Sequence, residues 1–367
     1  MEFLLNDEQR MLQASVRRLL ADTYAPTKAS PLGYHVGHWI TFAEQGWLGA
    51  GVLEANGGLG GGLEMLALIG EEFGRALVRE AFVSVAVVAA ELLQALAPEH
   101  PLLERLMTGD ARPVLAHFEP QSLGDERWVE TRAIEKGGGY RLTGAKSAVL
   151  GGPAADVLLV TARTGEEALT VFAVAPDAEG LTRQDYRTVD NRGASNLTLD
   201  DVHVDAAALV GKAGAAEADV RRALDHGVLV AASECVGAMD ATLAMSRDYL
   251  NTRKQFGRLI GDFQVLRHRL ADMYIEAEQA RAIVFRALAE AHSGEPDEQS
   301  RLASAAKVRV SQAGHYVTTQ AIQLHGGIGM TEELMVGHYF KRLTMFSLMG
   351  GADAAHLERY IRLGQSA

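Results

Sequence analysis

Apolar residues recur at helical spacing through the first part of the chain. Over residues 5–24, the positions that fall on one predicted face are Met11, Val16, Leu19 and Leu20. The longest apolar run, residues 81–90, is far shorter than the roughly 20 residues that a membrane span needs, and it predicts a buried helix. These patterns predict an N-terminal helical domain over residues 1–111.

A glycine-rich stretch, EQGWLGAGVLEANGGLGGG at residues 44–62, interrupts this pattern. Glycine-rich loops can bind phosphate, but no predicted strand precedes this one, and it lacks the Lys-Ser/Thr ending of a P-loop. A connection between helices explains the glycines better.

From residue 112 to residue 211 the hydrophobic period changes from helical spacing to two. Short segments rich in Val, Leu and Thr, such as VLLVTAR at 157–163 and LTVFAVA at 169–175, are typical of strands. Three glycines at 137–139 separate two such segments in the way a hairpin turn does. The pattern predicts a small middle β domain, which we expect to be barrel-like.

The helical period returns after residue 212. Between 228 and 246, apolar and small residues repeat at helical spacing, and two more long segments with similar periods follow. Three long antiparallel helices and a shorter one predict a four-helix bundle over residues 212–367. The fold class is therefore α+β, with a β domain between two helical domains.

Composition narrows the function further. The 367 residues carry a formal charge of −12, which argues against binding to nucleic acid or to an anionic membrane surface. The single cysteine, Cys235, excludes an intrachain disulfide and fits a reducing compartment. The first ten residues mix acidic and polar types, so we expect no signal peptide and no membrane insertion. We expect a cytoplasmic protein.

Several motifs resemble those of the flavin-dependent acyl-CoA dehydrogenases. They are YLNTRKQFGRLIGDFQVLRHRLADM at 249–273, AIQLHGGIGMTEE at 321–333, VHVDAAALVG at 202–211 and the glycine-rich segment followed by IGEEFGRAL. The resemblance runs over nearly the whole chain and includes the order of the three domains. GHYFKRLTM at 337–345 and the degenerate ending resemble the small subunits of two-component enzymes, such as that of pimeloyl-CoA dehydrogenase.

The resemblance implies an oxidoreductase that acts on the CH–CH bond of an acyl-CoA substrate with FAD as cofactor. Such a reaction removes a proton from Cα and a hydride from Cβ, so it needs a positioned base and a flavin on opposite faces of the substrate. Electron-transfer flavoprotein is a possible electron acceptor, and nothing in the resemblance calls for a metal. In the family, certain side chains reach across a subunit interface to the FAD of a neighbour. The matching positions are Arg253, Phe256, Gln264, Gln323, Gly326 and Gly327.

The residue chemistry agrees with this assignment. Arg253 offers a permanently charged donor for a pyrophosphate, and glycines such as Gly326 and Gly327 let backbone approach a cofactor closely. Arg253 alone would be explained as a solvated helix-end charge, but the complete pattern favours contact with FAD.

The chain departs from the family at the catalytic base. The usual glutamate position falls on Gly350, or on Ala352 when the alignment runs backward from the C-terminal helix. The other base position used in the family falls on Gly227. Glu234 is a weak candidate, because it shares a helix face with Gly227 but lies about 10 Å further along the axis.

The residues that pack on the flavin also differ from those of the family. Ala148 stands where the family has an aromatic residue, and Leu150 stands where it has a hydroxyl. The retained residues are those that reach a neighbour, so the sequence predicts an accessory subunit that completes a partner subunit's FAD site in a hetero-oligomer such as an α2β2 tetramer. The alternatives are a competent homotetrameric dehydrogenase that uses Glu234, a flavin-free structural relative, and a flavoenzyme with other chemistry. The acyl group is not readable from the sequence.

Overall fold

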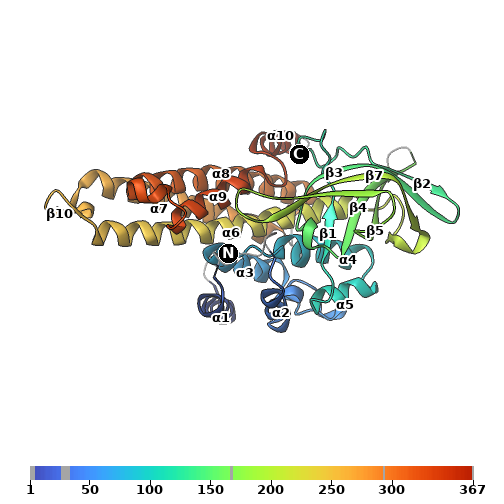
Figure 1. Ribbon diagram of the computed structural model, residues 1–367, viewed down its shortest axis with the longest axis horizontal. Coiled ribbons are helices and arrows are strands. Elements are labelled where there is room, and N and C mark those ends of the chain that lie inside the picture. The colour runs from blue at the N-terminus through green and yellow to red at the C-terminus, as the bar shows by residue number, and fades with distance from the viewer. Residues whose placement is uncertain (1–4, 26–33, 166–167, 292–293, 366–367) are drawn as a thin grey trace.

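The computed structural model describes residues 5–25, 34–165, 168–291 and 294–365. A long helical bundle occupies one end of the molecule and a β-sheet the other, and the N-terminal helices pack along one side of the bundle (Figure 1). One hydrophobic core runs through all three regions. The α+β class and the order of helical, β and helical segments are confirmed.

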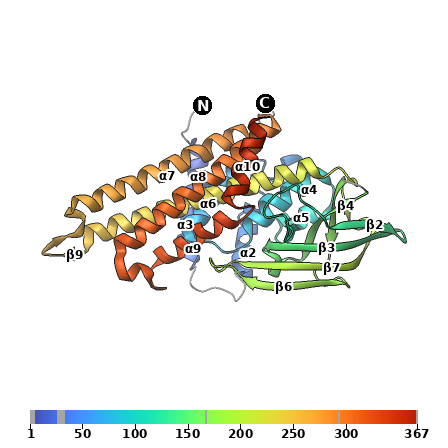
Figure 2. The same cartoon turned by 90° about the horizontal axis from the view of Figure 1, so that it is seen from above.

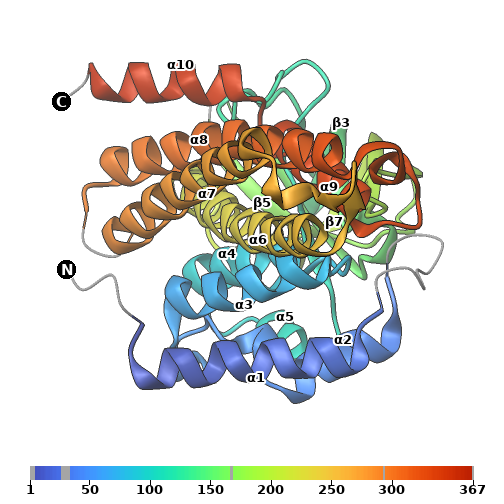
Figure 3. The ribbon, with the colours of Figure 1, turned by 90° about the vertical axis from the view of Figure 1, so that its left-hand side faces the viewer.

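The N-terminal helices form a layer beneath the bundle (Figure 3). They are α1 (Asp7–Thr23), α2 (Val36–Glu44), α3 (Gly62–Ala76), α4 (Ala90–Leu96) and α5 (Pro101–Met107). Asn6 caps α1, since its side chain accepts from the backbone N–H of Gln9 and the Gln9 side chain bonds back to Asn6. Val16 and Leu20 of α1 are buried as predicted, but Met11 is 73% exposed, so it does not belong to the packed face.

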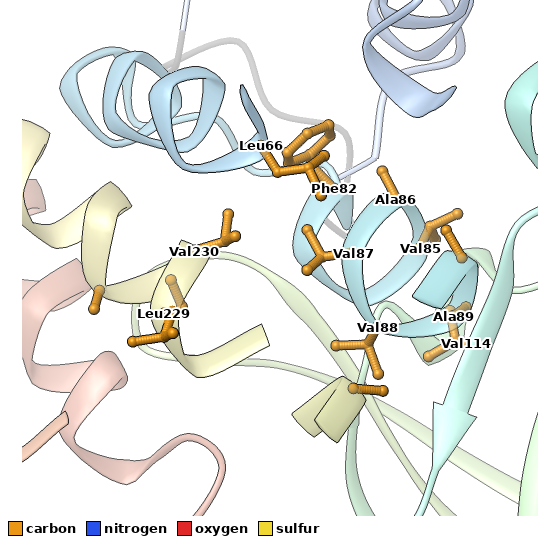
Figure 4. Close-up of a cluster of buried hydrophobic side chains, with 14 of the residues drawn as sticks. Leu66, Phe82, Val85, Ala86, Val87, Val88, Ala89, Val114, Leu229 and Val230 are labelled. Carbon is orange, nitrogen blue, oxygen red and sulfur yellow. The ribbon is translucent and has the colours of Figure 1, made fainter. Parts of the chain in front are cut away.

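The predicted buried helix over residues 81–90 is present in an unexpected form. Val83–Ala89 form a π-helix, η3, whose backbone continues into α4. Most of its side chains are buried, and they contact the N-terminal layer, the sheet and the bundle at once (Figure 4). π-helical segments are rare and are often found at functional sites.

The strands of the middle region form one eight-stranded sheet. They are β1 (Pro113–Ala116), β2 (Arg132–Lys136), β3 (Gly139–Leu150), β4 (Val157–Thr164), β5 (Ala168–Val174), β6 (Leu181–Arg187), β7 (Gly193–Asp205) and β8 (Leu209–Val210). The order is β6-β7-β3-β2-β4-β5-β8, and β1 pairs with β4 in parallel. The predicted glycine hairpin joins β2 to β3, with positive φ at Gly137 and Gly138, as a type I′ turn requires.

The C-terminal helices run lengthwise beside each other (Figure 2). They are α6 (Glu217–Thr252), α7 (Gln264–Glu290), α8 (Pro296–His325) and α9 (Met335–Leu348), followed by α10 (Asp353–Gly364), which packs on the outside of α8. A small hairpin of β9 (Lys254–Gln255) and β10 (Arg258–Leu259) forms the tip of the bundle between α6 and α7.

Glycines allow α3 and α6 to pack with their backbones nearly in contact. A Cβ atom at Gly74 would lie 1.7 Å from the backbone oxygen of Glu234, and one at Gly237 would lie 1.8 Å from that of Glu71. Only glycine fits at such a crossing. In the described part of the chain, α6 is the one helix long and apolar enough to cross a membrane, and 67% of its most apolar window is buried inside the protein, as in a core helix.

Candidate active site

A cavity of about 120 Å³ lies where the π-helix, β3, α6 and the turn between α9 and α10 meet. Its walls are mostly apolar and include Val83, Val88, Leu115, Val228 and Phe346. Gly227 and Gly350, the two positions expected for a base, both line this cavity. The structure therefore brings these two sequence positions together, and among the described residues no carboxylate lines the cavity.

Gly227 faces a fully occupied space. A Cβ atom added there would lie 2.6 Å from Cγ2 of Val88 on the π-helix. Valine is branched at Cβ and has little rotational freedom, so it cannot move aside cheaply. The packing that replaces an acid at this position is thus a direct contact between α6 and the π-helix.

Gly350 is constrained by its backbone. Its φ is +61° and that of Gly351 is +101°, both in the region that disfavours residues with a Cβ. Nε2 of His356 lies 2.8 Å from the Gly350 carbonyl oxygen, and Nδ1 lies 3.2 Å from Oγ of Ser304. Burial lowers the pKa of His356 to about 4, so the ring is neutral and donates to the carbonyl. These contacts hold the turn at residues 350–351 in place, and none of them involves a carboxylate.

The 350–351 turn is also covered from outside. Gly124, in the loop between β1 and β2, approaches so closely that a Cβ there would lie 2.5 Å from Cα of Gly351. Glu126 of the same loop forms an ion pair of 3.0 Å with Arg359 of α10. Arg359 in turn makes a bidentate contact with the buried carboxylate of Asp225 on α6.

Glu234 lies in a buried cluster of four charges. Its Oε2 accepts a hydrogen bond from Nη2 of Arg192 and lies 3.7 Å from Nη1 of Arg342. Arg342 donates from Nε to Oδ2 of Asp190 at 2.8 Å. Burial alone would raise the pKa of Asp190, but Arg342 and Arg192 outweigh it and hold that pKa below its ordinary value. Glu234 does not line the cavity, and together with Asp190 it already compensates the charges of Arg192 and Arg342.

In the cavity wall formed by β3, Ala148 and Leu150 present neither an aromatic ring nor a hydroxyl to a flavin. Ala148 has a φ of +52°, and its backbone N–H donates to Oδ1 of Asn196 at 3.1 Å. Behind this wall, Lys146 donates to Oε1 of Glu119 at 2.8 Å and to the His117 carbonyl at 3.1 Å. Burial lowers the pKa of Lys146 to about 8 and that of His117 to about 4. The network is internally satisfied and supports the sheet.

The side chains expected to contact FAD lie at the opposite end of the bundle, at its tip. Arg253 follows α6, Phe256 is in the β9–β10 turn, Gln264 begins α7, and Gln323 and the glycines are at the end of α8. All six residues are exposed, and Phe256 is 91% exposed with a φ of +54°. Tyr249 stacks on His325 with ring centroids 4.5 Å apart, which joins the ends of α6 and α8.

Sequence reasoning missed several residues around the cavity. The π-helix side chains Ser84 and Val88 were hidden in an apolar run, and Arg79 had no recognisable motif. Arg192 and Arg342 were not recognised as partners of Glu234, because the three residues are far apart in sequence. The one sequence signal for this cluster was that charged residues occur among apolar ones, which can indicate buried ion pairs.

Comparisons with known proteins agree with the fold. Models of the acyl-CoA dehydrogenase N-terminal, middle and C-terminal domains match residues 6–100, 115–202 and 218–362. The chain is 29% identical to a 3-sulfinopropanoyl-CoA desulfinase of Paraburkholderia xenovorans, covering 95% of this chain and 94% of the relative.

Solved structures show the same architecture. A variant of the Tcur3481–Tcur3483 steroid ACAD superposes with a TM-score of 0.88 at 30% identity, covering 98% of this chain and 99% of that one. A chain of the ChsE4–ChsE5 complex from Mycobacterium tuberculosis superposes with a TM-score of 0.91 at 25% identity over the full length of both chains. The protein therefore belongs to the acyl-CoA dehydrogenase family, whose members are flavoprotein oxidoreductases acting on CH–CH bonds.

Proposed function

We propose that this chain is the accessory subunit of a hetero-oligomeric acyl-CoA dehydrogenase and completes the FAD site of a partner subunit. The observation that carries the proposal is an asymmetry between the two ends of α6. At Gly227, toward one end, the position expected for a base is filled by packing, whereas Arg253, just beyond the other end, is exposed at a position expected to contact FAD. Two solved relatives whose names pair two different chains, Tcur3481–Tcur3483 and ChsE4–ChsE5, support this proposal.

The loss of the base is built into the packing of this chain. Gly227 leaves no room for a side chain, and Gly350 has a left-handed backbone that a glutamate would adopt only at a cost. Removal of the Cα proton needs a base within hydrogen-bond reach. A desaturation carried out by the complex would therefore take its base from the partner subunit.

The exposed tip suits a bound dinucleotide. Among the described residues, the guanidinium of Arg253 has no hydrogen-bond or ion-pair partner, and the Gly327 backbone is open, since a Cβ there would meet nothing within 4 Å. A free guanidinium is a strong partner for a pyrophosphate, and open glycine backbone permits close approach. These residues would hold FAD, which would supply the hydride acceptor.

FAD stoichiometry tests the proposal directly. The chain is purified alone and together with a candidate partner dehydrogenase subunit, and flavin absorbance is counted per chain. We expect almost no flavin on the isolated chain and about half an equivalent per chain in the complex. One FAD per chain in the isolated protein, with turnover, would contradict an accessory role.

A matched pair of variants locates the shared site. Arg253→Gln should weaken FAD retention by the complex. Arg247→Gln, which changes an exposed arginine of α6 that pairs with Asp248, should not. Equal retention by both variants would show that the tip does not reach the cofactor.

The alternative functions predict different experimental results. A homotetrameric dehydrogenase that uses Glu234 would need this carboxylate to leave Arg192, and its buried position argues against that. A flavin-free structural relative would stay colourless even in the complex. Use of electron-transfer flavoprotein as the electron acceptor remains a proposal, which reduction of that protein by the complex would test.

A second candidate function is loss of a terminal anion from a short acyl-CoA, as the desulfinase relative's name describes. The absence of a carboxylate among the described residues lining the cavity favours it. With 3-sulfinopropanoyl-CoA, the C–S bond would break, water would supply the oxygen that converts sulfinate to hydrogensulfite, and a proton would complete propanoyl-CoA. Release of one sulfite per propanoyl-CoA by the FAD-loaded chain alone would favour this function over an accessory role.

A further inference from the structure

A second cavity lies apart from the first, between the N-terminal helices and the bundle. Its volume is about 190 Å³, and residues of α1, α3, α6 and α7 line it, with α3 between α1 and α6 (Figure 3). None of the described residues that line it also lines the first cavity. Much of its wall is apolar and includes Leu68 of α3, Val236 of α6, and Phe285 and Leu288 of α7. An apolar cavity of about 150 Å³ can hold one benzene molecule, so this one has room for a ring with a short substituent.

One carboxylate in this wall has an unused acceptor. Glu71 of α3 lines the cavity and is only 7% exposed. Its Oε1 accepts a hydrogen bond from Nη1 of Arg281 at 3.1 Å, whereas its Oε2 has no hydrogen-bond partner in the described part of the chain. Burial raises the pKa of Glu71 above its ordinary value, and the charge of Arg281 offsets this only in part. A carboxylate buried to this extent is costly without donors, so a ligand that donates to Oε2 would stabilise it.

The charges around Glu71 favour a cationic donor over a neutral one. Four carboxylates share three arginines in one network of ion pairs, which consists of Glu71, Glu72, Asp240 and Glu278 with Arg17, Arg75 and Arg281. Arg281 also lines the cavity, but its Nη2 is bonded to both carboxylate oxygens of Asp240 at 2.8 Å. Glu64, another lining residue, has no ion-pair partner within the described ranges. The cavity wall therefore carries two carboxylates and one arginine that is already paired.

We propose that this cavity binds a small amine with an apolar body, whose ammonium group donates to Oε2 of Glu71 and whose body packs against Phe285 and Leu288. The Ser233 hydroxyl, which donates to the Leu229 carbonyl at 3.0 Å, also lines the cavity and keeps lone pairs that can accept a second hydrogen bond. Burial of the apolar body and a charge-assisted hydrogen bond to the carboxylate both favour binding. The site shares no residue with the first cavity or with the tip of the bundle, so it is independent of the proposed accessory role.

Three probes of similar size and different charge test the proposal: benzylamine, benzyl alcohol and benzoate. At neutral pH the first is a cation, the second is neutral and the third is an anion. Isothermal titration of the purified chain should show benzylamine binding about tenfold tighter than benzyl alcohol, the size of one charge-assisted hydrogen bond, and benzoate binding more weakly than either. Equal affinity for the amine and the alcohol, tighter binding of benzoate, or no binding of benzylamine would overturn the proposal.

A matched pair of variants assigns the preference to Glu71. Glu71→Gln should remove most of the tenfold preference for benzylamine and leave the binding of benzyl alcohol in place. Glu104→Gln, which changes an exposed glutamate of α5 that does not line the cavity, should alter neither. A preference that survives Glu71→Gln in a folded protein would show that the carboxylate does not bind the ammonium.

A cavity-filling variant keeps the test decisive if Glu71→Gln fails to fold. Ala289 of α7 lines the cavity and is only partly buried, so Ala289→Phe can fill the space from its rim. Affinity for benzylamine and for benzyl alcohol should then fall at least about tenfold, since the ring loses its buried site. Unchanged affinities would show that the probes bind elsewhere and would overturn the proposal. Because no flavin is measured, failure here leaves the FAD stoichiometry result unaffected.

Discussion

Gly227 of α6 and Val88 of the π-helix pack so closely that a Cβ on the glycine would lie 2.6 Å from the valine Cγ2. This contact occupies one of the two positions that the sequence resemblance predicts for a base. It also fixes the floor of the pocket, because Val88 lines the cavity beside Gly227. The packing of one apolar side chain thus leaves no room for an acid at Gly227 and narrows the pocket.

The Gly227–Val88 contact predicts strong coupling between substitutions. Gly227→Ala should destabilise the protein by about 1–3 kcal/mol, the usual cost of overpacking a core. In a Val88→Ala background the same change should be neutral or stabilising, since alanine favours a helix by up to about 1 kcal/mol over glycine. Urea unfolding of the four proteins measures the coupling, and additive effects would contradict the contact.

The backbone at Gly350 predicts a different pattern. Gly350→Ala should cost about 1–2 kcal/mol, because φ is positive while the nearest atom to an added Cβ, Cγ2 of Val228, is at an acceptable 3.5 Å. Gly350→Asn should cost less, since asparagine tolerates this conformation. Gly337→Ala in α9 is the control, with no positive φ and no close contact. Equal shifts of the unfolding midpoint for Gly350→Ala and Gly337→Ala would exclude backbone strain as the cause.

The buried charge cluster predicts that Glu234 stabilises the fold. Glu234→Gln leaves Arg192 and Arg342 with one carboxylate between them, and it should cost about 3 kcal/mol of unfolding free energy, since breaking a buried pair strands a charge. Glu332→Gln, which removes an exposed partner of Lys341, should leave the unfolding midpoint unchanged. Loss of turnover by Glu234→Gln with unchanged stability would instead support its use as a base.

Local patterns in the sequence predicted much of the fold. Periods of 3.6 and 2 located the helices and strands, and three glycines located the β2–β3 turn with its positive φ values. Burial of 81–90 was also predicted, but its π-helical form was not, because apolar residues alone do not distinguish an α-helix from a π-helix.

The candidate site was less predictable. Gly227 and Gly350 could be aligned with the base positions, yet their meeting in one cavity depends on contacts across more than one hundred residues. The same holds for the pairing of Glu234 with Arg192, which joins α6 to the loop before β7.

The neutral His356 predicts a dependence of stability on pH. Its pKa is about 4 in the folded protein and near 6.5 when unfolded, so between these values the unfolded chain binds more protons. Stability contributed by the neutral ring is complete above about pH 6.5 and is lost as the pH falls toward 4, at about 1.4 kcal/mol per pH unit. His117, with a pKa of about 4, adds a similar slope.

His356→Gln should therefore flatten the stability profile between pH 4 and 6.5, whereas His315→Gln, at an exposed position, should not. Parallel profiles for wild type and His356→Gln would mean that the ring titrates normally, and that the turn at Gly350 is held by other contacts.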